Sequence, residues 1–467
     1  MVGEQQDKPS GGATTRDWLV PRAPGPVRAL VRLPGSKSMT NRALILAALS
    51  DSPTLINGPL LARDTQLMAG ALRALGYRID ESDGAWRVER AAGARFAAAS
   101  RRAIEIDVGN AGTVLRFVPP VAALTSSDVR FAGDRRMSQR PVGPLLTALR
   151  ELGVLISDDE SGAVPFVVHG RGTVPGGSVT LDASSSSQLV SGLLLAAAQF
   201  DSGAEIRHCG PPVPSAPHID MTVKMLALAG VHVTATPAAE GGRAPAPGER
   251  GETSHGRSVV QIWTVPAGKI KADRIDIEPD LSNAMPFLAG ALATGSEVTI
   301  AGWPDGSLQP AARIIELLTS MGAHVQATAD GLRVTGGGQI SGIDADLSEV
   351  GELTPVLTAL ATLASSPSQF RGIGHLRRHE SDRLAALAGE IGKLGGDVTE
   401  TADGLRIGPA PLRAAGVAFD SHDDHRLVMA AAVLGLATGG LRVRNAATVG
   451  KTFPAFSRVW AQTFAPA

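Results

Sequence analysis

The sequence predicts an α/β fold built from two similar domains, and three observations lead to this prediction. The chain has 467 residues, which is too long for one ordinary hydrophobic core. Hydrophobic residues make up 43% of it, which is enough to fill sizeable interiors. One pattern of helices and strands recurs six times, so each half of the chain holds three repeated α/β units.

Each unit is expected to contain a helix, a strand, a loop, a second helix and a second strand. The helices show apolar residues at positions i, i+3 and i+4, whereas the strands come close to alternation. The second helix closes on Leu-Gly or a similar pair, and the first three such glycines, Gly76, Gly153 and Gly230, are evenly spaced. The first helices of the six units are predicted within residues 36–49, 109–124, 184–198, 280–293, 349–364 and 423–437.

The sixth unit lacks room for its closing strand. The segment "PVRALVRLPG" at residues 26–35 is expected to supply one, which brings both chain ends into the same domain. We therefore expect one discontinuous domain from residues 21–35 and 279–467, and a second domain from residues 36–278. The active site is expected in the cleft between them.

Two segments are expected to lie outside the packed domains. Residues 1–20 are predicted to be a disordered tail, because their sequence has no apolar run. Residues 236–258 interrupt the repeat with proline, glycine and charged residues that have little to bury. They are predicted to be a flexible surface insertion.

The bulk composition argues against several functional classes. The 44 basic and 45 acidic residues nearly cancel, which disfavours a general nucleic-acid or membrane-surface binder. The single cysteine, Cys209, excludes an intramolecular disulfide and a multi-cysteine metal site. The longest uncharged stretch, between Arg426 and Arg442, falls short of the roughly 20 residues of a membrane span, so a buried helix is predicted there. We expect a cytoplasmic protein.

Polar residues crowd at the starts of the six first helices. Serine, asparagine and aspartate at such positions commonly cap the helix, and this explanation suffices for any one of them alone. Capping does not require Lys37, Gln188 or Arg426, however. If the six helices point the same way, their N-termini surround one cleft, where the helix dipoles favour bound anions.

Loop residues add further charge to this set. The loop "RRHESDR" places His379, Glu380 and Arg383 close together, although a charge run is usually a solvated face. "VGKTF" ends like a phosphate-binding loop, but Asn445 stands where that loop needs its first glycine, so a nucleotide-triphosphate motif is rejected. The remaining charged set consists of Lys37, Arg136, Glu352, Glu380, Arg383, Arg426 and Lys451.

This set suits a small substrate with several negative charges. Guanidinium groups bind phosphate and carboxylate in bidentate fashion, whereas a lysine acts as a point charge or a proton donor. Two carboxylates among many cations are candidates for proton transfer. The residues alone thus indicate a phosphorylated, carboxylated metabolite, acid–base chemistry and no metal.

Seven motifs carry a resemblance to a known family. In order along residues 34 to 456, they are "PGSKSMTNRALILAAL", "GNAGTVLRF", "RMSQRPVGPL", "SSSSQLVSGLLLAA", "RRHESDRL", "DDHRLVMA" and "GKTFPAF". Together they resemble the enolpyruvyl transferase family and span nearly the whole chain. The resemblance implies two domains, each an inside-out α/β barrel of three units around parallel helices, with both termini in one domain.

The resemblance also implies a reaction and a set of contacts. The enolpyruvyl group of phosphoenolpyruvate would be transferred to the 5-hydroxyl of shikimate 3-phosphate, as a step of aromatic amino acid biosynthesis. Phosphoenolpyruvate would be held by Lys37, Asn110, Gly112, Arg136, Gln188, Arg383, Arg426 and Lys451. Shikimate 3-phosphate would be held by Lys37, Ser38, Arg42, Ser186, Ser187, Gln188, Ser215, Glu352 and His379.

The implied chemistry is addition followed by elimination. We assign Glu352 to the 5-hydroxyl proton, Glu380 to the methylene carbon and Lys37 to the bridging oxygen and phosphate. Closure of the two domains would exclude water and complete the site. No cofactor, metal, nucleic acid or membrane is implied, and a monomer is expected.

Several positions depart from the common family pattern. Histidine stands at 218, 375 and 379, where tyrosine, asparagine and lysine are usual, and the charge of such a histidine depends on pH. Glu352 provides a longer arm than the more common aspartate, and Phe117 replaces a proline.

Two alternative functions remain open from the sequence. The sister enzyme that uses UDP-N-acetylglucosamine typically has Lys-Asn in place of Lys37-Ser38 and a cysteine on a mobile loop, whereas Cys209 lies elsewhere. The second alternative is a non-catalytic protein that has the same fold and binds anions. The resemblance further suggests inhibition by glyphosate, because Gly112 leaves space beside the phosphoenolpyruvate site.

Overall fold

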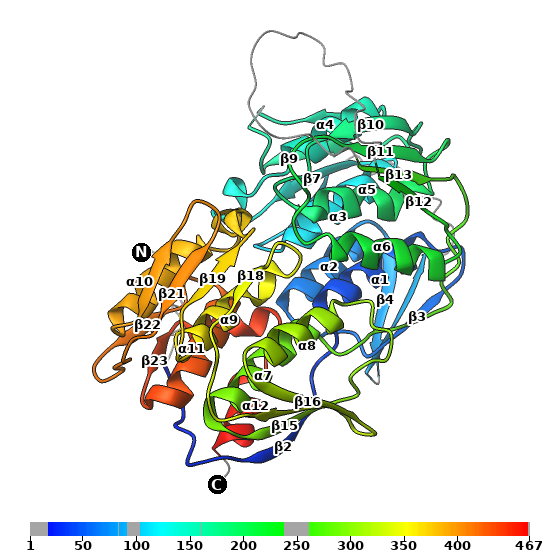
Figure 1. Cartoon of the computed structure of the whole chain (residues 1–467). Coiled ribbons are helices and arrows are strands. Elements are labelled where there is room, and N and C mark those ends of the chain that lie inside the picture. The colour runs from blue at the N-terminus through cyan, green and yellow to red at the C-terminus, as the bar shows by residue number, and fades with distance from the viewer. Residues whose placement is uncertain (1–16, 83, 91–102, 160, 238–260, 466–467) are drawn as a thin grey trace, which may run out of the picture.

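The computed structural model describes residues 17–82, 84–90, 103–159, 161–237 and 261–465. Within these ranges the strands form six small sheets, five with four strands and one with three. The sheets lie on the outside of the molecule and the most apolar helices lie inside (Figure 1). The six sheets correspond to the six predicted units.

The N-terminal half contains three sheets and six helices among its described residues. The first sheet has the order β14-β3-β5-β4, the second β6-β7-β9-β8 and the third β10-β11-β13-β12. The helices of this half are α1 (Lys37–Leu49), α2 (Arg63–Ala74), α3 (Gly112–Ala123), α4 (Gly143–Glu151), α5 (Ser187–Ala197) and α6 (Pro217–Leu228). The strands are β3 (Thr54–Asn57), β4 (Tyr77–Ser82), β5 (Ala85–Arg90), β6 (Ile104–Asp107), β7 (Asp128–Ala132), β8 (Leu155–Ser157), β9 (Phe166–His169), β10 (Gly177–Leu181), β11 (Ala204–His208), β12 (Thr234–Pro237), β13 (Gln261–Val265) and β14 (Arg274–Asp276).

The C-terminal half repeats this arrangement. Its sheets have the orders β16-β17-β15-β2, β18-β19-β21-β20 and β1-β23-β22. Its helices are α7 (Leu281–Thr294), α8 (Ala311–Ser320), α9 (Thr354–Ala361), α10 (Arg383–Lys393), α11 (His425–Thr438) and α12 (Phe456–Phe464). Its short 3-10 turns are η2 (Gly351–Leu353), η3 (Gly374–Arg378) and η4 (Ala446–Lys451), and the N-terminal half has one such turn, η1 (Met137–Gln139), among its described residues. The strands are β1 (Trp18–Leu19), β2 (Arg28–Val31), β15 (Glu297–Ala301), β16 (Ala323–Thr328), β17 (Gly331–Gly336), β18 (Asp344–Asp346), β19 (Ser368–Arg371), β20 (Asp397–Glu400), β21 (Leu405–Gly408), β22 (Ala418–Asp420) and β23 (Arg442–Arg444).

Each four-stranded sheet holds two strands more than the predicted unit. A leading strand pairs in parallel with the strand after the first helix, as β6 pairs with β7, and the second helix is followed by an antiparallel hairpin rather than by a single strand. The leading strands are short, and sequence alternation over three to five residues is too weak a signal to separate them from loops.

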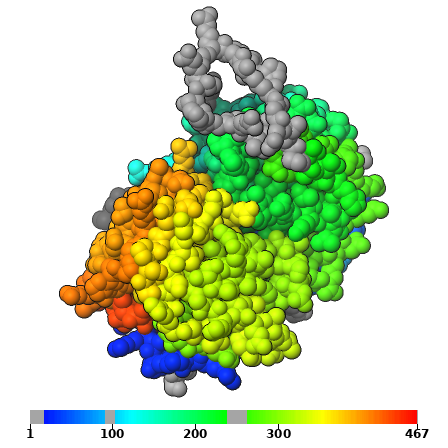
Figure 2. Space-filling model, viewed as in Figure 1, coloured from blue at the N-terminus to red at the C-terminus, as the bar shows by residue number. Residues whose placement is uncertain are grey.

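The chain crosses between the halves twice. Strand β2 is the leading strand of the fourth unit, since it pairs in parallel with β15. Strand β14 follows the third unit in the sequence, but it pairs in parallel with β3 and is therefore the leading strand of the first unit. At the crossing, Gly35 and Pro279 form an isolated antiparallel bridge. In the space-filling view, the blue N-terminal segment accordingly lies against the C-terminal half (Figure 2).

Two predictions about the N-terminus were wrong in detail. The segment at residues 26–35 joins the fourth unit and does not close the sixth; β1 closes the sixth by antiparallel pairing with β23. Residues 18–20 do not belong to a disordered tail, since Trp18 and Leu19 are in that strand and Val20 is buried. Residues 1–16 lie outside the described part. The predicted insertion at 236–258 also lies outside it, except for residues 236 and 237, which belong to β12.

The six first helices form the interior. Helices α1, α3 and α5 pack on one another in the N-terminal half, and α7, α9 and α11 do so in the C-terminal half. They are buried almost all round, which explains why their sequences are apolar on every face. The stretch before Arg442 is such a helix, α11, as predicted. Buried apolar residues fall into two clusters, one within residues 39–272 and one joining residues 20 and 31 to 281–464.

Glycine ends the second helix of five units for a conformational reason. Gly76, Gly153 and Gly230 adopt φ values of 94°, 92° and 81°, in the region that other residues avoid, and Gly322 and Gly395 do the same. The regular spacing in the sequence thus marks the point where each outer helix turns into its hairpin.

Close packing between α3 and α5 predicts a stability effect at Gly192. A Cβ atom there would lie 2.2 Å from the carbonyl oxygen of Arg116, so Gly192→Ala must push the two inner helices apart. We expect the free energy of unfolding to fall by about 1–3 kcal/mol, as measured by urea denaturation. Gly389→Ala is the matched control, because Gly389 is exposed on α10 and a Cβ atom added there would meet no other atom within 4 Å. That change should leave stability unchanged or slightly higher, and equal losses in both variants would contradict the packing argument.

Candidate active site

One cavity is lined by the starts of all six first helices. As predicted, their N-termini point at the same space, which places several sets of free backbone N–H groups around it. The contributing residues are Ser36, Lys37 and Ser38 before and in α1, Thr113 in α3, Ser185, Ser186, Ser187 and Gln188 at α5, Asp280, Leu281 and Ser282 at α7, Glu352 and Leu353 before α9, and His425 and Arg426 in α11. The cavity therefore lies between the two halves of the chain.

The start of α1 carries a lysine in a buried, charged setting. Ser36 caps the helix through its hydroxyl, which accepts from the Met39 backbone. The ammonium of Lys37 lies 3.3 Å from the carboxylate of Asp64 in α2, and its backbone N–H donates to Asp280. Burial lowers the pKa of Lys37 below its ordinary value, while Asp64 opposes this shift. Lys37 is thus a better proton donor than a free lysine.

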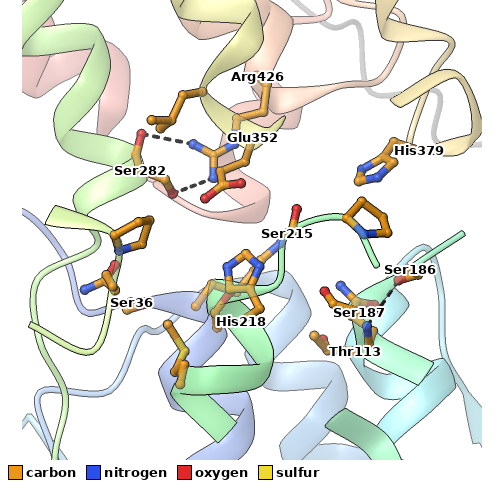
Figure 3. A pocket seen from close by; sticks show the side chains of 18 of the residues that line it. Ser36, Thr113, Ser186, Ser187, Ser215, His218, Ser282, Glu352, His379 and Arg426 are labelled. Atoms are coloured by element: carbon orange, nitrogen blue, oxygen red, sulfur yellow. Dashed lines mark hydrogen bonds between the residues drawn. The ribbon is translucent and has the colours of Figure 1, made fainter. Parts of the chain in front are cut away.

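Serine hydroxyls form one wall of the same cavity. Ser186 caps α5 by accepting from the backbone of Gln188, and Ser187 is the first residue of that helix. Ser215 has φ 54°, and its backbone N–H donates across the two halves to the carbonyl of Ser348 at 2.7 Å. The amide oxygen of Gln188 accepts from Arg116. Figure 3 shows Ser186, Ser187 and Ser215 on the side of the cavity below His379. This wall combines hydroxyls with a helix N-terminus, which suits an anion.

Arg42, predicted to hold shikimate 3-phosphate, is not among the residues that line the cavity. Its side chain is buried, and its guanidinium donates to Thr222, to Ser191 and to the backbone carbonyls of Ser38 and His218. The N–H donors of the Arg42 guanidinium are therefore engaged by acceptors within the protein. Arg42 instead holds the backbone of two residues that do line the cavity.

A second cavity adjoins the first at Glu380, which lines both. It is lined by Asn110, Arg136 and Lys451 among others. The ammonium of Lys451 lies 2.9 Å from the carbonyl oxygen of Asn110 and 2.9 Å from the carboxylate of Glu380, so it connects the two halves. Arg136 reaches the backbone carbonyl of His379 at 3.5 Å.

Glu380 is held between two cations. Besides Lys451, the guanidinium of Arg383 lies 2.9 Å from it, and Arg383 also pairs with the capping carboxylate of Asp424. Burial alone would raise the pKa of Glu380, but Lys451 and Arg383 outweigh burial and hold that pKa well below its usual range. Glu380 is therefore an ionised carboxylate when no substrate is bound.

Arg426 and Glu352 complete the cation and carboxylate set. Arg426 donates to the hydroxyl of Ser282 at 2.6 Å and to its carbonyl at 3.1 Å, which fixes the guanidinium at the start of α7. Figure 3 shows the Glu352 side chain close to this pair and directed into the cavity. The predicted residues Lys37, Ser38, Ser186, Ser187, Gln188, Ser215, Glu352, His379, Glu380, Arg383 and Arg426 all line the first cavity, and Asn110, Arg136 and Lys451 line the second.

The predicted residue Gly112 lines neither cavity, although it begins α3 beside them. A Cβ atom there would lie 2.5 Å from a guanidinium nitrogen of Arg140 and 2.8 Å from one of Arg116. The absence of a side chain therefore lets two arginines pack against the helix start.

Four residues at the site stand outside the predicted catalytic and ligand-binding sets. Asp64 and Asp280 balance the charge of the α1 start, Arg140 lines the first cavity and donates to Asn110, and His425 lies buried at the start of α11. Both ring nitrogens of His425 lack a hydrogen-bond partner. Asp64 lies in the first turn of α2, an outer helix whose start the sequence interpretation did not consider, whereas His425 was visible in "DDHR" beside the predicted Arg426.

Comparisons with known proteins agree with this architecture. A structure of EPSP synthase from Acinetobacter baumannii has 24% sequence identity and a TM-score of 0.75, with 96% of this chain and 98% of that chain covered. A second structure of EPSP synthase from that organism, also 24% identical, has a TM-score of 0.74 over the same shares. The enolpyruvyl transferase NikO from Streptomyces tendae has 15% identity and a TM-score of 0.69, again covering 96% and 98%. These matches confirm the predicted α/β fold.

The fold is that of the enolpyruvyl transferases. The family model described as EPSP synthase (3-phosphoshikimate 1-carboxyvinyltransferase) matches residues 21–460. The chain belongs to the EPSP synthase family, and its activity is that of a 3-phosphoshikimate 1-carboxyvinyltransferase in the shikimate pathway. This confirms the family and the reaction that the motifs indicated.

Neither a metal cluster nor a membrane span is found in the described part of the chain. Across those residues, no three histidine, cysteine, aspartate or glutamate side chains gather in a way that could hold a metal ion. Nor does any helix there have the length and apolar character needed to cross a membrane.

The charge balance at Glu380 predicts a pH-dependent stability effect. Glu380→Gln leaves Lys451 and Arg383 without their shared carboxylate, so the free energy of unfolding at neutral pH should fall by about 3–5 kcal/mol. The pKa of Glu380 is lower in the folded protein than in the unfolded chain, where it is about 4.3. The stability that Glu380 contributes is therefore fully present above the unfolded-state pKa and is lost as pH falls through the folded-state pKa. Urea denaturation at neutral and acidic pH measures this difference.

The control for this prediction is Glu400→Gln. Glu400 pairs with Arg377 in a partly exposed ion pair, so the change should alter stability by no more than about 1 kcal/mol. A Glu380→Gln protein as stable as the wild type at neutral pH would contradict the assigned charge balance.

Proposed function

We propose that the two adjoining cavities bind shikimate 3-phosphate and phosphoenolpyruvate side by side and that Lys37, Glu352 and Glu380 carry out the transfer. The observation that supports this most strongly is the convergence of six helix N-termini on one space that also holds Lys37, Arg383 and Arg426. Such a space favours a ligand with several negative charges.

The serine wall suits shikimate 3-phosphate. Ser186, Ser187 and Ser215 offer hydroxyls beside the start of α5, and Lys37, Ser38, Gln188, Glu352 and His379 line the same cavity. We assign the phosphate to the hydroxyls, because a helix N-terminus stabilises phosphate. Arg42 is assigned a positioning role, since it holds the carbonyls of Ser38 and His218.

The cations around Glu380 suit phosphoenolpyruvate. Lys451, Arg383 and Arg136 approach Glu380 or its neighbour His379, and Asn110 supplies the carbonyl that Lys451 touches. Lys37, Gln188 and Arg426 face the same region from the first cavity, and Gly112 begins the helix behind it. A phosphate and a carboxylate can each pair with a guanidinium here.

The charge state of Glu380 gives the order of events. As the predicted acid for the methylene carbon, Glu380 needs a proton, which Lys451 and Arg383 oppose in the unliganded protein. Phosphoenolpyruvate competes for those same cations, so its binding moves the pKa of Glu380 back toward the ordinary range and allows protonation. Glu352 then takes the 5-hydroxyl proton as that oxygen bonds to the central carbon of phosphoenolpyruvate, while Glu380 gives its proton to the methylene carbon, which forms a tetrahedral ketal phosphate. Glu380, ionised again, removes a methyl proton as the carbon–oxygen bond to phosphate breaks, and Lys37 protonates the departing oxygen.

Lys37 and the arginines stabilise the departing phosphate. Charge grows on the bridging oxygen as the carbon–oxygen bond breaks, and a lysine with a lowered pKa can donate a proton to it. Arg426 is held in place by Ser282 before any substrate arrives, which limits the reorganisation needed at this step.

The domain division and the oligomeric state are part of the proposal. The two separate apolar clusters, within residues 39–272 and within 281–464 together with residues 20 and 31, support a discontinuous domain that contains both chain ends. We propose that the enzyme works as a monomer in the cytoplasm.

A phosphate-release assay tests the proposed reaction. Phosphoenolpyruvate is supplied with shikimate 3-phosphate or with UDP-N-acetylglucosamine, and release is expected only with the first. No release with shikimate 3-phosphate would refute the proposal. Lys37→Ala should reduce turnover at least about 10³-fold, because charge on the leaving group loses its donor.

Cys209→Ser is the matched control for that variant. Cys209 lines neither cavity, and its backbone N–H donates to Leu181. Turnover should therefore remain close to that of the wild type. A Cys209→Ser enzyme without activity would favour the sister reaction, in which a cysteine takes part.

Gly112→Ala should weaken inhibition by glyphosate, for which this family is the known target. The added methyl group meets the guanidiniums of Arg140 and Arg116, which must shift from their places beside the proposed phosphoenolpyruvate site. We expect the inhibitor concentration for half-maximal inhibition and the KM for phosphoenolpyruvate to rise by at least about tenfold, as steady-state kinetics would measure. Unchanged inhibition would contradict the placement of this helix start beside the site.

A further inference from the structure

Two histidines form a pair at the edge of the first cavity. The rings of His375 in η3 and His379 are 5.6 Å apart at 63°, edge to face, and both residues line the cavity. Nε2 of His375 has no hydrogen-bond partner. Nδ1 of His379 lies 3.5 Å from a guanidinium nitrogen of Arg383, which is a donor only, so that ring nitrogen is the acceptor. The geometry therefore fits a neutral His379 ring.

The surroundings of His379 explain why it is neutral without substrate. Arg383 lies beside Nδ1, and Glu380 is 3.8 Å from the same atom but already serves Lys451 and Arg383. Burial, and then Arg383, hold the pKa of His379 well below its ordinary value. The charged and titratable groups that face His379 or its backbone are His375, Glu380, Arg383, Arg140 and Arg136.

A bound phosphate would reverse this balance. In the proposed function, the phosphate of shikimate 3-phosphate lies on the wall formed by Ser186, Ser187 and Ser215, which line the same cavity as His379. Figure 3 shows His379 on the side of the cavity where Ser186 lies. A phosphate monoester carries about −1.5 to −2 charges near neutral pH. The serine hydroxyls contribute no positive charge, so the wall lacks a cation of its own.

We propose that His379 takes up a proton when shikimate 3-phosphate binds, so that binding consumes a proton and forms an imidazolium–phosphate pair. The proposal rests on the proposed placement of the phosphate. The proton comes from solvent and ends on Nδ1 of His379, the ring nitrogen that carries none in the neutral ring; the hydrogen bond from Arg383 to that atom is lost, and no covalent bond other than the new N–H changes. His375 is a positioning residue, because its ring packs edge to face against that of His379 and supports it.

The proposal fixes the sign of a pH effect on affinity. A group whose pKa is higher in the complex than in the free protein favours binding at lower pH. The affinity for shikimate 3-phosphate should therefore fall as pH rises through the pKa of His379 in the complex, by up to about tenfold per pH unit. A lysine at position 379 is already charged near neutral pH and removes this dependence.

Isothermal titration calorimetry with shikimate 3-phosphate tests the proposal. At about pH 7.5, where the ligand phosphate is almost fully ionised, the binding enthalpy is measured in buffers with different ionisation enthalpies. Its slope against the buffer enthalpy gives the number of protons taken up. We expect about half to one proton for the wild type, and none for His379→Lys or His379→Gln. Shikimate without the phosphate should give no uptake in any of them.

The matched control is His324→Gln. His324 lies on β16 and lines neither cavity, so this variant should take up as many protons as the wild type. A wild-type slope of zero would refute the proposal even if turnover is normal. Equal uptake in wild type and His379→Lys would assign the proton to another group and refute it as well. Absence of any binding by shikimate 3-phosphate would instead refute the proposed function on which the inference rests.

Discussion

The excess of positive charge where six helix N-termini meet is the constraint on which the site depends. Helix dipoles and free N–H groups make this space positive before any side chain is counted. Lys37, Arg383, Arg426 and Lys451 add charge to it, with little exposure to water. Such a space is stable without ligand only if carboxylates balance it, and Asp64, Asp280, Glu380 and Asp424 do so.

Those balancing carboxylates also link stability to function. Asp280 caps α7 and also accepts from the backbone N–H of Lys37, so it serves two helix starts. Asp424 caps α11 and pairs with Arg383, so it satisfies a helix end and a cation at once. Glu380 differs, because it lines both cavities and holds two cations that an anionic substrate needs. In the proposed function, the substrate exchanges one set of ion pairs for another, and the protonation of Glu380 follows from that exchange.

The two crossings between the halves place this charge in a shared space. Strand β2 is fixed to β15 and β14 to β3, so residues 32–36 and 277–280 run side by side between the two sets of sheets. Lys37 begins α1 directly after the first crossing, and Asp280 caps α7 directly after the second. The hydrogen bond from the Lys37 backbone to Asp280 therefore connects the two helix starts at the centre of the cleft.

The sequence by itself determined the repeat, the inner helices and most of the site. Helix periodicity, glycine closures and polar helix starts are local signals, and each reports a backbone requirement that does not depend on distant partners. Only the tertiary structure decided the partners of Lys37, the position of Arg42 behind the cavity, and the pairing of β2 with β15 rather than with the sixth unit. These features depend on contacts between residues far apart in the chain. The neighbours of a short strand in the sequence do not determine which sheet edge it pairs with, and the neighbours of a buried charge do not determine its ion-pair partner. Both are determined by the tertiary fold.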